Sequence, residues 1–462
     1  MLNTVSIISP IDGSVVAERP LATTKELTAA VNTAVKAQAN WRHVPILDKA
    51  VMCHKAIDLL LANTDAIAEE ITRQMGRPIQ YAPGELRGLQ ERGRYMIDIA
   101  EQALADLAVS HDGTKRFIRR SPLGVVLTIA PWNYPYLTAV NSIIPALMAG
   151  NTVLLKHSTQ TLLCAERLQQ AFAEAGLPKG VFQSVFVDHA GTAELIKNPA
   201  IDFISFTGSV AGGIKIEQTA AGLFKGLALE LGGKDPAYVR EDADMEHAVA
   251  NLVDGAYFNS GQSCCGIERI YVHKNSYQDF VEQFVETVKQ YKLANPLLAD
   301  TSLGPMVNSA AADRVREQIN KALAAGARAC IDSRQFTEDK GGTPYLAPQV
   351  LIDVTHAMAV MQDESFGPVV GIMPVNDDKQ AIELMNDSRY GLTASIWSND
   401  MDKAVEIGDA LQTGTVFMNR CDYLDPALAW VGVKQSGRGC ALSSLGYSQL
   451  TRPKSFHLKK LS

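Results

Sequence analysis

The sequence predicts an α/β fold built from two domains. A chain of 462 residues is long enough for two or three domains with substantial cores. Two separate stretches, from about residue 125 to 231 and from about residue 244 onward, alternate short β-branched runs with amphipathic segments. Such alternation is typical of parallel sheets joined by right-handed helical crossovers. The glycine pair Gly232-Gly233 lies between the two stretches, and we place the domain boundary there.

The first stretch combines five strand candidates with helical segments. Residues 162–176 place apolar side chains three and four positions apart, which is the spacing of a helix that packs on one face. Residues 24–109 follow the same pattern over most of their length, so we expect them to be largely helical and to pack on this sheet. The strand candidates are VVLTIA (125–130), NTVLLK (151–156), VFQSVF (181–186), IDFISF (201–206) and GLALEL (226–231).

The second stretch has the same organisation. Residues 277–291 and 311–326 are predicted helices. The strand candidates are ERIYVHK (268–274), QVLIDV (349–354), VVGIMPV (369–375), ASIWS (394–398) and TVFMN (415–419).

A basic segment and the C-terminal tail form a third feature. Four basic residues alternate with Phe117 and Ile118, which indicates a solvated strand rather than a binding patch. The tail SFHLKK (455–460) is a further strand candidate, and we expect it to pair with the basic strand. The four residues are Lys115, Arg116, Arg119 and Arg120.

The composition narrows the class of protein. A net charge of -7 and a pI near 5.8 argue against nucleic-acid binding. The first residues lack a basic region followed by a long apolar run, so we expect no secretory signal. Gly, Pro or polar residues interrupt the longest apolar stretches well short of a membrane span, so we expect no membrane segment. Seven irregularly spaced cysteines fit a reducing cytoplasm, and no cysteine or histidine spacing resembles a metal site.

A glycine-rich turn is the first candidate functional element. IDFISF runs into Thr207-Gly208-Ser209, followed by a helical pattern. Backbone N–H groups and the positive end of a helix can bind a pyrophosphate at such a turn. The spacing differs from Gly-x-Gly-x-x-Gly, so by itself the segment is better explained as a plain glycine-rich connection.

Three further residues could carry chemistry. Cys264 lies between small residues, where an accessible thiolate can attack a carbonyl carbon, although isolated cysteines are more often small core residues. Glu230 ends an apolar strand, where burial raises a carboxylate pKa and favours a general base; a solvated strand end or an ion pair with Lys234 explains it equally well by itself. Asn133 lies in the rigid loop PWNYP after a strand and can direct its amide at an oxyanion, whereas a structural turn is the default interpretation of the loop by itself.

Taken together and in order, these segments resemble the aldehyde dehydrogenase superfamily over almost the whole chain. PWNYP, GNTVLLK, FTGS, ELGGK, GQSC, ESFGPV and GVKQSGRG each match a motif of that family. The resemblance implies two Rossmann-like α/β domains with a small β oligomerisation segment. It implies a cofactor-binding domain at 1–110 and 125–231, a catalytic domain at 232–435, and oligomerisation strands at 111–124 and 436–462.

The resemblance also implies an activity, the oxidation of an aldehyde to the acid with NAD(P)+. Cys264 occupies the nucleophile position, with the oxyanion held by Asn133 and the Cys264 N–H. Glu230 is expected to activate water that hydrolyses the thioester. Relatives that transfer the acyl group to coenzyme A typically lack this glutamate, so that alternative is less favoured. A non-catalytic structural member of the family is disfavoured because all three residues are retained.

The expected cofactor site follows from the same resemblance. Thr159 stands where NAD-preferring relatives commonly have a glutamate that binds the ribose 2′-hydroxyl. Without that carboxylate a 2′-phosphate meets no like charge, so we expect NADP to be accepted. The expected cofactor-binding residues are Trp132, Lys156, Thr159, Gly208, Ser209, Glu364 and Phe366.

Two other departures concern proton transfer. Many relatives carry a lysine at the position of Ser142 and an Arg-Glu pair at the position of Cys440-Ala441. Their joint absence predicts that Glu230 exchanges protons with bulk water by another route, or that deacylation is slow.

The substrate is expected to be a small aldehyde. Arg420 is a candidate for binding a distal carboxylate, which makes succinate semialdehyde the first candidate substrate, and an ion pair on the loop is the alternative role. Aromatic residues nearby equally suit an aromatic or medium-chain aliphatic aldehyde. The predicted substrate residues are Tyr134, Asn141, Ser263, Cys265 and Arg420. The family that the chain resembles usually assembles through a basic strand and a C-terminal strand of this kind, so the resemblance implies a homodimer or homotetramer.

Overall fold

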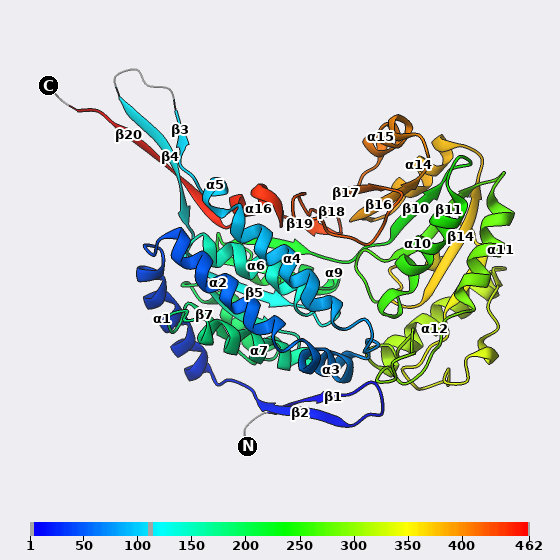
Figure 1. Ribbon diagram of the computed structural model, residues 1–462, viewed down its shortest axis with the longest axis horizontal. Coiled ribbons are helices and arrows are strands. Elements are labelled where there is room, and N and C mark those ends of the chain that lie inside the picture. The colour runs from blue at the N-terminus through cyan, green and yellow to red at the C-terminus, as the bar shows by residue number, and fades with distance from the viewer. Residues whose placement is uncertain (1–3, 110–113, 461–462) are drawn as a thin grey trace.

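A computed structural model describes residues 4–109 and 114–460. Two α/β lobes lie side by side, and a three-stranded sheet projects from the first lobe as an arm (Figure 1). Residues 111–113 and 461–462 of the predicted oligomerisation strands lie outside the described residues.

The first lobe is built on a six-stranded sheet. Its strands are parallel except β19, which runs antiparallel to β9. All five strands predicted between 125 and 231 are present, with ends that differ from the prediction by at most three residues. In sheet order the strands are β19 (Gly437–Arg438), β9 (Gly226–Glu230), β8 (Phe203–Thr207), β5 (Val125–Ala130), β6 (Thr152–His157) and β7 (Phe182–Ser184).

Helices cover this sheet, and the segment 24–109 is largely helical as predicted. A short hairpin, β1 (Thr4–Ile8) and β2 (Val15–Pro20), precedes them and was not predicted. The helices are α1 (Thr24–Trp41), α2 (Ile46–Leu61), α3 (Thr64–Met75), α4 (Gly84–Asp98), α5 (Ala100–Ala103), α6 (Leu137–Met148), the 3₁₀ turn η1 (Thr159–Thr161), α7 (Leu162–Glu174), α8 (His189–Lys197) and α9 (Val210–Ala220).

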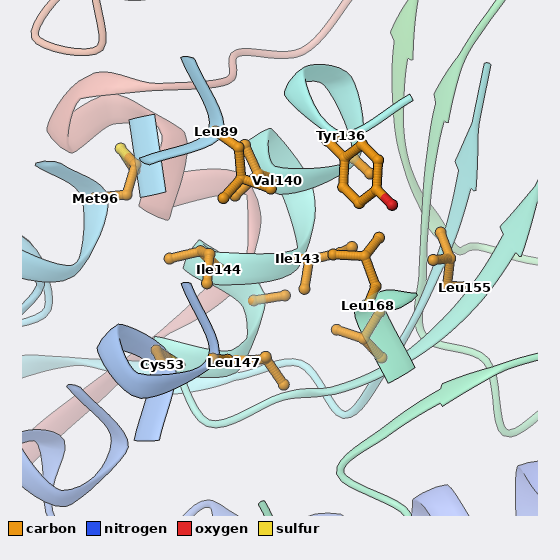
Figure 2. Packing of buried hydrophobic residues seen from close by; sticks show 14 of the residues in the cluster. Cys53, Leu89, Met96, Tyr136, Val140, Ile143, Ile144, Leu147, Leu155 and Leu168 are labelled. Carbon is orange, nitrogen blue, oxygen red and sulfur yellow. The ribbon is translucent and has the colours of Figure 1, made fainter. Parts of the chain in front are cut away.

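Helix α6 lies at the centre of the first lobe, enclosed by α2, α4, α7 and strand β6. Aliphatic side chains from these elements are buried together in one core. Because a close-packed core tolerates little displacement, this packing fixes α4 and α6 relative to each other. Figure 2 shows this core around α6 and its N-terminal flank, formed by Tyr136, Val140, Ile143, Ile144, Leu147, Leu89, Met96, Cys53, Leu168 and Leu155.

The second lobe contains a seven-stranded sheet that is parallel except at β12. Strand β10 was not predicted, because its sequence DPAYV is short and contains Pro236; the pairing with β11 shifts register at this proline. In sheet order the strands are β12 (Arg328–Ala329), β13 (Gln349–Ile352), β14 (Val369–Val375), β11 (Ile267–His273), β10 (Asp235–Val239), β16 (Thr393–Trp397) and β17 (Thr415–Met418).

The helices of the second lobe include both segments that the sequence predicts. A two-stranded ladder joins β15 (Tyr390–Gly391) to β18 (Val433–Lys434). The helices are α10 (Met245–Tyr257), η2 (Phe258–Gly261), α11 (Tyr277–Val288), α12 (Ser309–Ala324), η3 (Ser333–Gln335), α13 (Ala359–Gln362), α14 (Asp378–Asn386) and α15 (Met401–Ala410).

The arm is the predicted pairing of the basic strand with the C-terminal tail. Helix α16 (Ser443–Gln449) leads into β20 (Thr451–Leu458), which runs antiparallel to β4 (Lys115–Pro122), with β3 (Leu107–Ala108) on the other side of β4. Phe117 stacks on Phe456 with ring centroids 4.5 Å apart, directly across the pair. The expected pairing of the tail with the basic strand is therefore confirmed.

Candidate active site

The loop that carries the adjacent cysteines follows α10 and has an unusual backbone. Asn259, Ser260 and Gly261 have positive φ angles of 54°, 57° and 69°, a region that costs a non-glycine residue about 1–2 kcal/mol. The Gln262 side chain holds this turn by donating to the Asn259 carbonyl at 3.0 Å and accepting from a backbone amide of the second lobe at 2.8 Å. The turn places Cys264 on the wall of an internal cavity.

The two thiols differ in environment. Cys264 is half-buried, whereas Cys265 is 3% exposed. The Cys265 thiol donates to Asp422 Oδ1 at 2.9 Å, and the Ser263 hydroxyl donates to the same oxygen at 3.1 Å. The hydrogen bond with the Cys264 thiol and burial raise the pKa of Cys265 well above its usual range. Cys265 is therefore held as a protonated thiol at neutral pH, and Cys264 is the more accessible of the two.

Asn133 lies against the cysteine loop. Its side chain is buried, and Nδ2 donates to the Gln262 carbonyl at 3.1 Å, two residues before Cys264. Its backbone carbonyl accepts from Asn259 Nδ2 at 3.4 Å. The structure thus brings together the Asn133 amide and the cysteine loop, as the predicted oxyanion site requires.

A buried ion pair that the sequence analysis missed supports this arrangement. Arg77 Nη1 lies 2.5 Å from Glu85 Oε2, and both side chains are at most 1% exposed. The Arg77 guanidinium donates to the Asn133 carbonyl at 2.5 Å and lies 4.6 Å from the Tyr134 ring centroid. Glu85 Oε1 accepts from two backbone amides at the start of α6, each at 2.9 Å. Arg77 lies in the loop between α3 and α4 and Glu85 lies in α4, and neither belongs to a sequence motif that indicates this role.

Glu230 ends β9 on the cavity wall. Burial raises its pKa to about 7, and the 3.3 Å hydrogen bond from the Thr207 hydroxyl and the positive charge of Arg92 limit that rise. The alternative ion pair with Lys234 is wrong, because Lys234 Nζ lies 2.6 Å from Glu268 Oε2 and both side chains are buried. Glu230 therefore has the burial and pKa that general-base catalysis near neutral pH requires.

The glycine pair at the lobe boundary lets three motifs approach one another. A Cβ at Gly233 would lie 2.3 Å from the Cys264 carbonyl oxygen, and a Cβ at Gly232 would lie 2.4 Å from both carboxylate oxygens of Glu364. Gly233 N–H donates to Glu364 Oε1 at 3.1 Å, and burial raises the pKa of Glu364 to about 7. Only glycine fits here without displacing the cysteine loop or Glu364.

The predicted phosphate turn has the geometry of an anion-binding element. Ser209 caps α9, its hydroxyl accepting from the Gly212 amide at 3.2 Å. A Cβ at Gly208 or Gly212 would lie 2.6 or 2.8 Å from the Phe206 ring, so both positions require glycine. The turn fits a pyrophosphate, because backbone N–H groups of glycine residues, which no side chain covers, lie at the positive N-terminal end of an eleven-residue helix.

Lys156 lies at the end of β6 without a partner. Burial lowers its pKa, and no hydrogen bond or ion pair to its ammonium group exists among the described residues. The negative charge of Asp188 opposes this lowering of the Lys156 pKa. Thr159, three residues later, is exposed. A desolvated ammonium group beside an exposed threonine fits a ribose hydroxyl or its 2′-phosphate, the role predicted for these residues.

Trp132 and Phe366 meet across the two lobes, with ring centroids 5.7 Å apart in an edge-to-face arrangement. Glu268, the buried partner of Lys234, also accepts from the amides of Ser365 and Phe366 at 2.7 and 2.9 Å. These bonds hold the loop of Glu364 and Phe366 near the tryptophan of the PWNYP loop. Trp132 of the first lobe and Phe366 of the second, both predicted cofactor residues, therefore lie in contact.

The cavity has a volume of about 280 Å³ and receives residues from α4, α6, β9, the cysteine loop and the loop after β17. Arg420, a predicted substrate residue, does not line it. This residue is exposed, and its guanidinium carbon lies 3.4 Å from the Tyr423 ring centroid. The placement of Arg420 on the cavity wall is wrong, because the loop turns its side chain onto a neighbouring aromatic ring. The predicted substrate residues that do line the cavity are Tyr134, Asn141, Ser263 and Cys265.

Ser142 and Ala441 stand where many relatives carry a lysine and a glutamate, and neither residue is hydrogen-bonded to Glu230. The Ser142 hydroxyl shares a 3.0 Å hydrogen bond with the Thr128 hydroxyl, and the backbone of Ala441 pairs with that of Trp430. Within the described residues no lysine and no second carboxylate is hydrogen-bonded to Glu230.

Residues 4–109 and 114–460 contain no group of three or more His, Cys, Asp or Glu side chains placed to hold a metal ion. No helix in these ranges has the length and apolarity needed to cross a membrane.

Comparison with known proteins identifies the family. The model of the aldehyde dehydrogenase family matches residues 2–456. This chain belongs to the aldehyde dehydrogenase family, which confirms the predicted fold, the predicted family and the predicted class of activity, NAD(P)-dependent aldehyde oxidation.

Its relatives include enzymes of one substrate class. The chain is 34% identical over 439 residues to "Succinate semialdehyde dehydrogenase [NAD(P)+] Sad" of Escherichia coli (strain K12), covering 95% of this chain and 94% of that protein. It is 34% identical over 452 residues to "Succinate-semialdehyde dehydrogenase [NADP(+)]" of Mycobacterium avium (strain 104), covering 96% and 94%. The structure of a succinic semialdehyde dehydrogenase from Streptococcus pyogenes with NADP+ superimposes with a TM-score of 0.94 at 27% identity, covering 99% and 100%.

Proposed function

We propose that this protein oxidises a short-chain semialdehyde, with succinate semialdehyde as the first candidate, to the dicarboxylic acid with NADP+. The observation that carries the proposal is that Cys264 and Glu230 line one cavity while Asn133 binds the backbone of the cysteine loop. A nucleophile, a base and an oxyanion donor at one site suffice for aldehyde oxidation with hydrolysis of the acyl intermediate.

The first half of the reaction depends on Cys264. Its thiolate adds to the aldehyde carbon, the carbonyl π electrons move to oxygen, and the resulting thiohemiacetal oxyanion accepts hydrogen bonds from the Asn133 amide and the Cys264 N–H. Trp132, Lys156, Ser209, Glu364 and Phe366 are the residues that would hold the cofactor. The bound nicotinamide supplies a hydride acceptor for the carbon-bound hydrogen, which leaves a thioester on Cys264.

The second half depends on Glu230. The ionised carboxylate accepts a proton from water as the water oxygen adds to the thioester carbon. Collapse of that adduct breaks the C–S bond, releases the acid and regenerates the Cys264 thiolate. The proton leaves Glu230 through water in the cavity, because the lysine and glutamate of many relatives are replaced by Ser142 and Ala441.

A panel of aldehydes with both cofactors tests the proposed function. We expect reduction of NADP+ with succinate semialdehyde in the absence of coenzyme A, because Glu230 supplies the base for hydrolysis. Turnover that requires coenzyme A would identify an acylating enzyme, and faster turnover of an aromatic or medium-chain aldehyde would reassign the substrate. Absence of thiol-dependent reduction with every aldehyde would indicate a non-catalytic member of the family.

Cofactor choice is tested at Thr159. Replacing Thr159 by Glu puts a carboxylate near the adenosine ribose, and we expect kcat/KM with NADP+ to fall by roughly 10- to 100-fold through like-charge repulsion. The matched variant Thr159→Gln has the same size without the charge, so it should retain NADP+ use within about threefold. Equal effects of the two substitutions would contradict the assignment.

Assembly and location are proposed on the same basis. The arm of β3, β4 and β20 presents the basic strand away from both lobes (Figure 1), and we propose that it mediates a homodimer or homotetramer. All seven cysteines are free thiols, which supports a reducing cytoplasmic location. We retain the proposed division into a cofactor-binding domain, a catalytic domain beginning at residue 232, and oligomerisation strands.

A further inference from the structure

Helix α4 brings a cation to the wall of the cavity. Glu85, Gly88 and Arg92 follow one another at helical spacing, so they share one face of α4, and all three line the cavity. A Cβ at Gly88 would lie 2.3 Å from a methyl carbon of Leu137, so glycine at this position lets α4 approach α6 closely. This close approach carries Arg92 against α6.

Arg92 has no ionic partner. Its guanidinium donates from Nη1 to the Leu137 carbonyl at 3.2 Å, and no Asp or Glu oxygen of the described residues lies within 4.0 Å of its nitrogens. Burial lowers the pKa of Arg92, and the negative charge of Glu85 is the main effect that opposes this shift. Arg77, the other arginine of the cavity wall, is already paired with Glu85. Arg92 is half-buried on the cavity wall, so its guanidinium group is free to form charge-assisted hydrogen bonds with an anionic ligand.

Asn141 provides a second, independent observation. Its side chain is 4% exposed, lines the cavity, and has no hydrogen-bond partner for either Nδ2 or Oδ1 within the described residues. Buried amides are normally satisfied, and an orphan amide costs about 1–3 kcal/mol. An amide left unpaired at a cavity wall indicates that a ligand completes its hydrogen bonds.

The two groups belong to one corner of the cavity. Leu137, whose carbonyl accepts from Arg92, lies one turn before Asn141 on α6, so both line the same face of that helix. Arg92 and Asn141 line the same cavity as Cys264 and Glu230, so this corner opens onto the space that the reacting thiol faces. Asp422, an acidic residue of the same cavity wall, accepts hydrogen bonds from Ser263 and Cys265 and forms no ion pair with Arg92.

We propose that Arg92 and Asn141 together bind the distal carboxylate of the aldehyde substrate, and so select a short-chain semialdehyde over an uncharged aldehyde. This inference rests on the proposed oxidation at Cys264 and assigns the role once given to Arg420 to a different residue. The guanidinium supplies charge-assisted hydrogen bonds, and Asn141 Nδ2 donates to a carboxylate oxygen. The proximity to Cys264 favours a short spacer between the carboxylate and the aldehyde carbon.

The test compares two substrates of equal size. Succinate semialdehyde and 4-oxopentanal have the same number of heavy atoms, but a methyl group replaces the charged oxygen in the second. We expect Arg92→Met to lower kcat/KM for succinate semialdehyde by roughly 10- to 150-fold, mainly through KM, and Asn141→Ala by roughly 5- to 10-fold. Neither variant should change kcat/KM for 4-oxopentanal by more than about threefold.

Two controls separate binding from folding. Arg87 is exposed on the same helix and does not line the cavity, so Arg87→Met should behave as wild type with both substrates. The product succinate should raise the melting temperature of the wild type but not of Arg92→Met, a readout that needs no turnover. Because Arg92 has no ionic partner, Arg92→Met should fold and melt at or above the wild-type temperature.

The outcomes distinguish this inference from the proposed function. Selective loss of succinate semialdehyde turnover in the two variants supports the role of Arg92 and Asn141. Equal losses with both substrates, or a wild type that prefers 4-oxopentanal, would overturn that role while leaving aldehyde oxidation intact. A wild type that oxidises neither substrate nor any other aldehyde would overturn the proposed function itself.

Discussion

Replacing Cys264 by alanine should abolish aldehyde oxidation, lowering kcat by roughly 10⁴-fold or more, because no other group at the site can form the thioester. The adjacent thiol cannot take over. Cys265 is buried, and its hydrogen bonds to Asp422 and the Cys264 thiol keep it protonated. Cys265→Ser should therefore retain activity within about tenfold of wild type. Stopped-flow measurement of cofactor reduction with succinate semialdehyde checks both variants.

A thiol outside the site provides the control. Cys330 is half-buried in the second lobe and does not line the cavity, so Cys330→Ser should leave the rate unchanged. Labelling with iodoacetamide should modify Cys264 first in the wild type, and bound aldehyde should protect it. Undiminished turnover by the Cys264→Ala protein would refute the assignment of the nucleophile.

The sequence predicts the strands and the lobe boundary well because their signals are local. Runs such as VVLTIA and VVGIMPV are strands at the predicted residues, and the chain passes from one sheet to the other between Glu230 and Asp235, around the predicted glycine pair. The pairing of the tail with the basic strand was also predictable, since both segments have alternating sequences. Local patterns do not show β10, where a proline sits in a buried central strand.

The site was predictable only where a motif fixes the backbone. Glu230, Asn133 and Cys264 each belong to a short motif. In contrast, Arg77 lies in the loop between α3 and α4 and Arg92 lies in α4, and the roles of both depend on how the helices pack. Arg420 was misplaced for a related reason. Asn419 and Asp422 both have positive φ angles, 53° and 48°, so the chain turns sharply on either side of it. Sequence spacing alone cannot indicate where a side chain in such a loop points.

The cavity corner formed by Arg92 and Asn141 is held in place by the packing of the first lobe. The core around α6 (Figure 2) fixes the two helices that carry Arg92 and Asn141. The buried pair of Arg77 and Glu85 connects α4 to the start of α6 and to the Asn133 carbonyl. Substrate anchoring and oxyanion binding are therefore coupled through the same helices, and a substitution at Glu85 would disturb both.

Replacing Glu230 by glutamine should separate the two halves of the reaction. Without a base the thioester still forms, so we expect a burst of reduced cofactor equal to the concentration of active sites, followed by a steady rate lowered by roughly 10²- to 10⁴-fold. Mass spectrometry of the quenched protein should find the acyl group on the peptide that contains Cys264. Hydroxylamine, a nucleophile that needs no base, should restore turnover by releasing the acyl group as a hydroxamate.

The pH dependence of the wild type gives the same residue a second test. Glu230 accepts a proton only when ionised, and burial raises its pKa to about 7. The steady rate should therefore rise as pH increases through about 7 and level off above about pH 8, and this dependence should be absent from the residual rate of Glu230→Gln. The burst reports acylation and the steady rate reports deacylation, so ionisation of the nucleophile is measured separately. A Glu230→Gln protein with wild-type steady turnover would show that another group activates water, despite the direct access of Glu230 to the cavity.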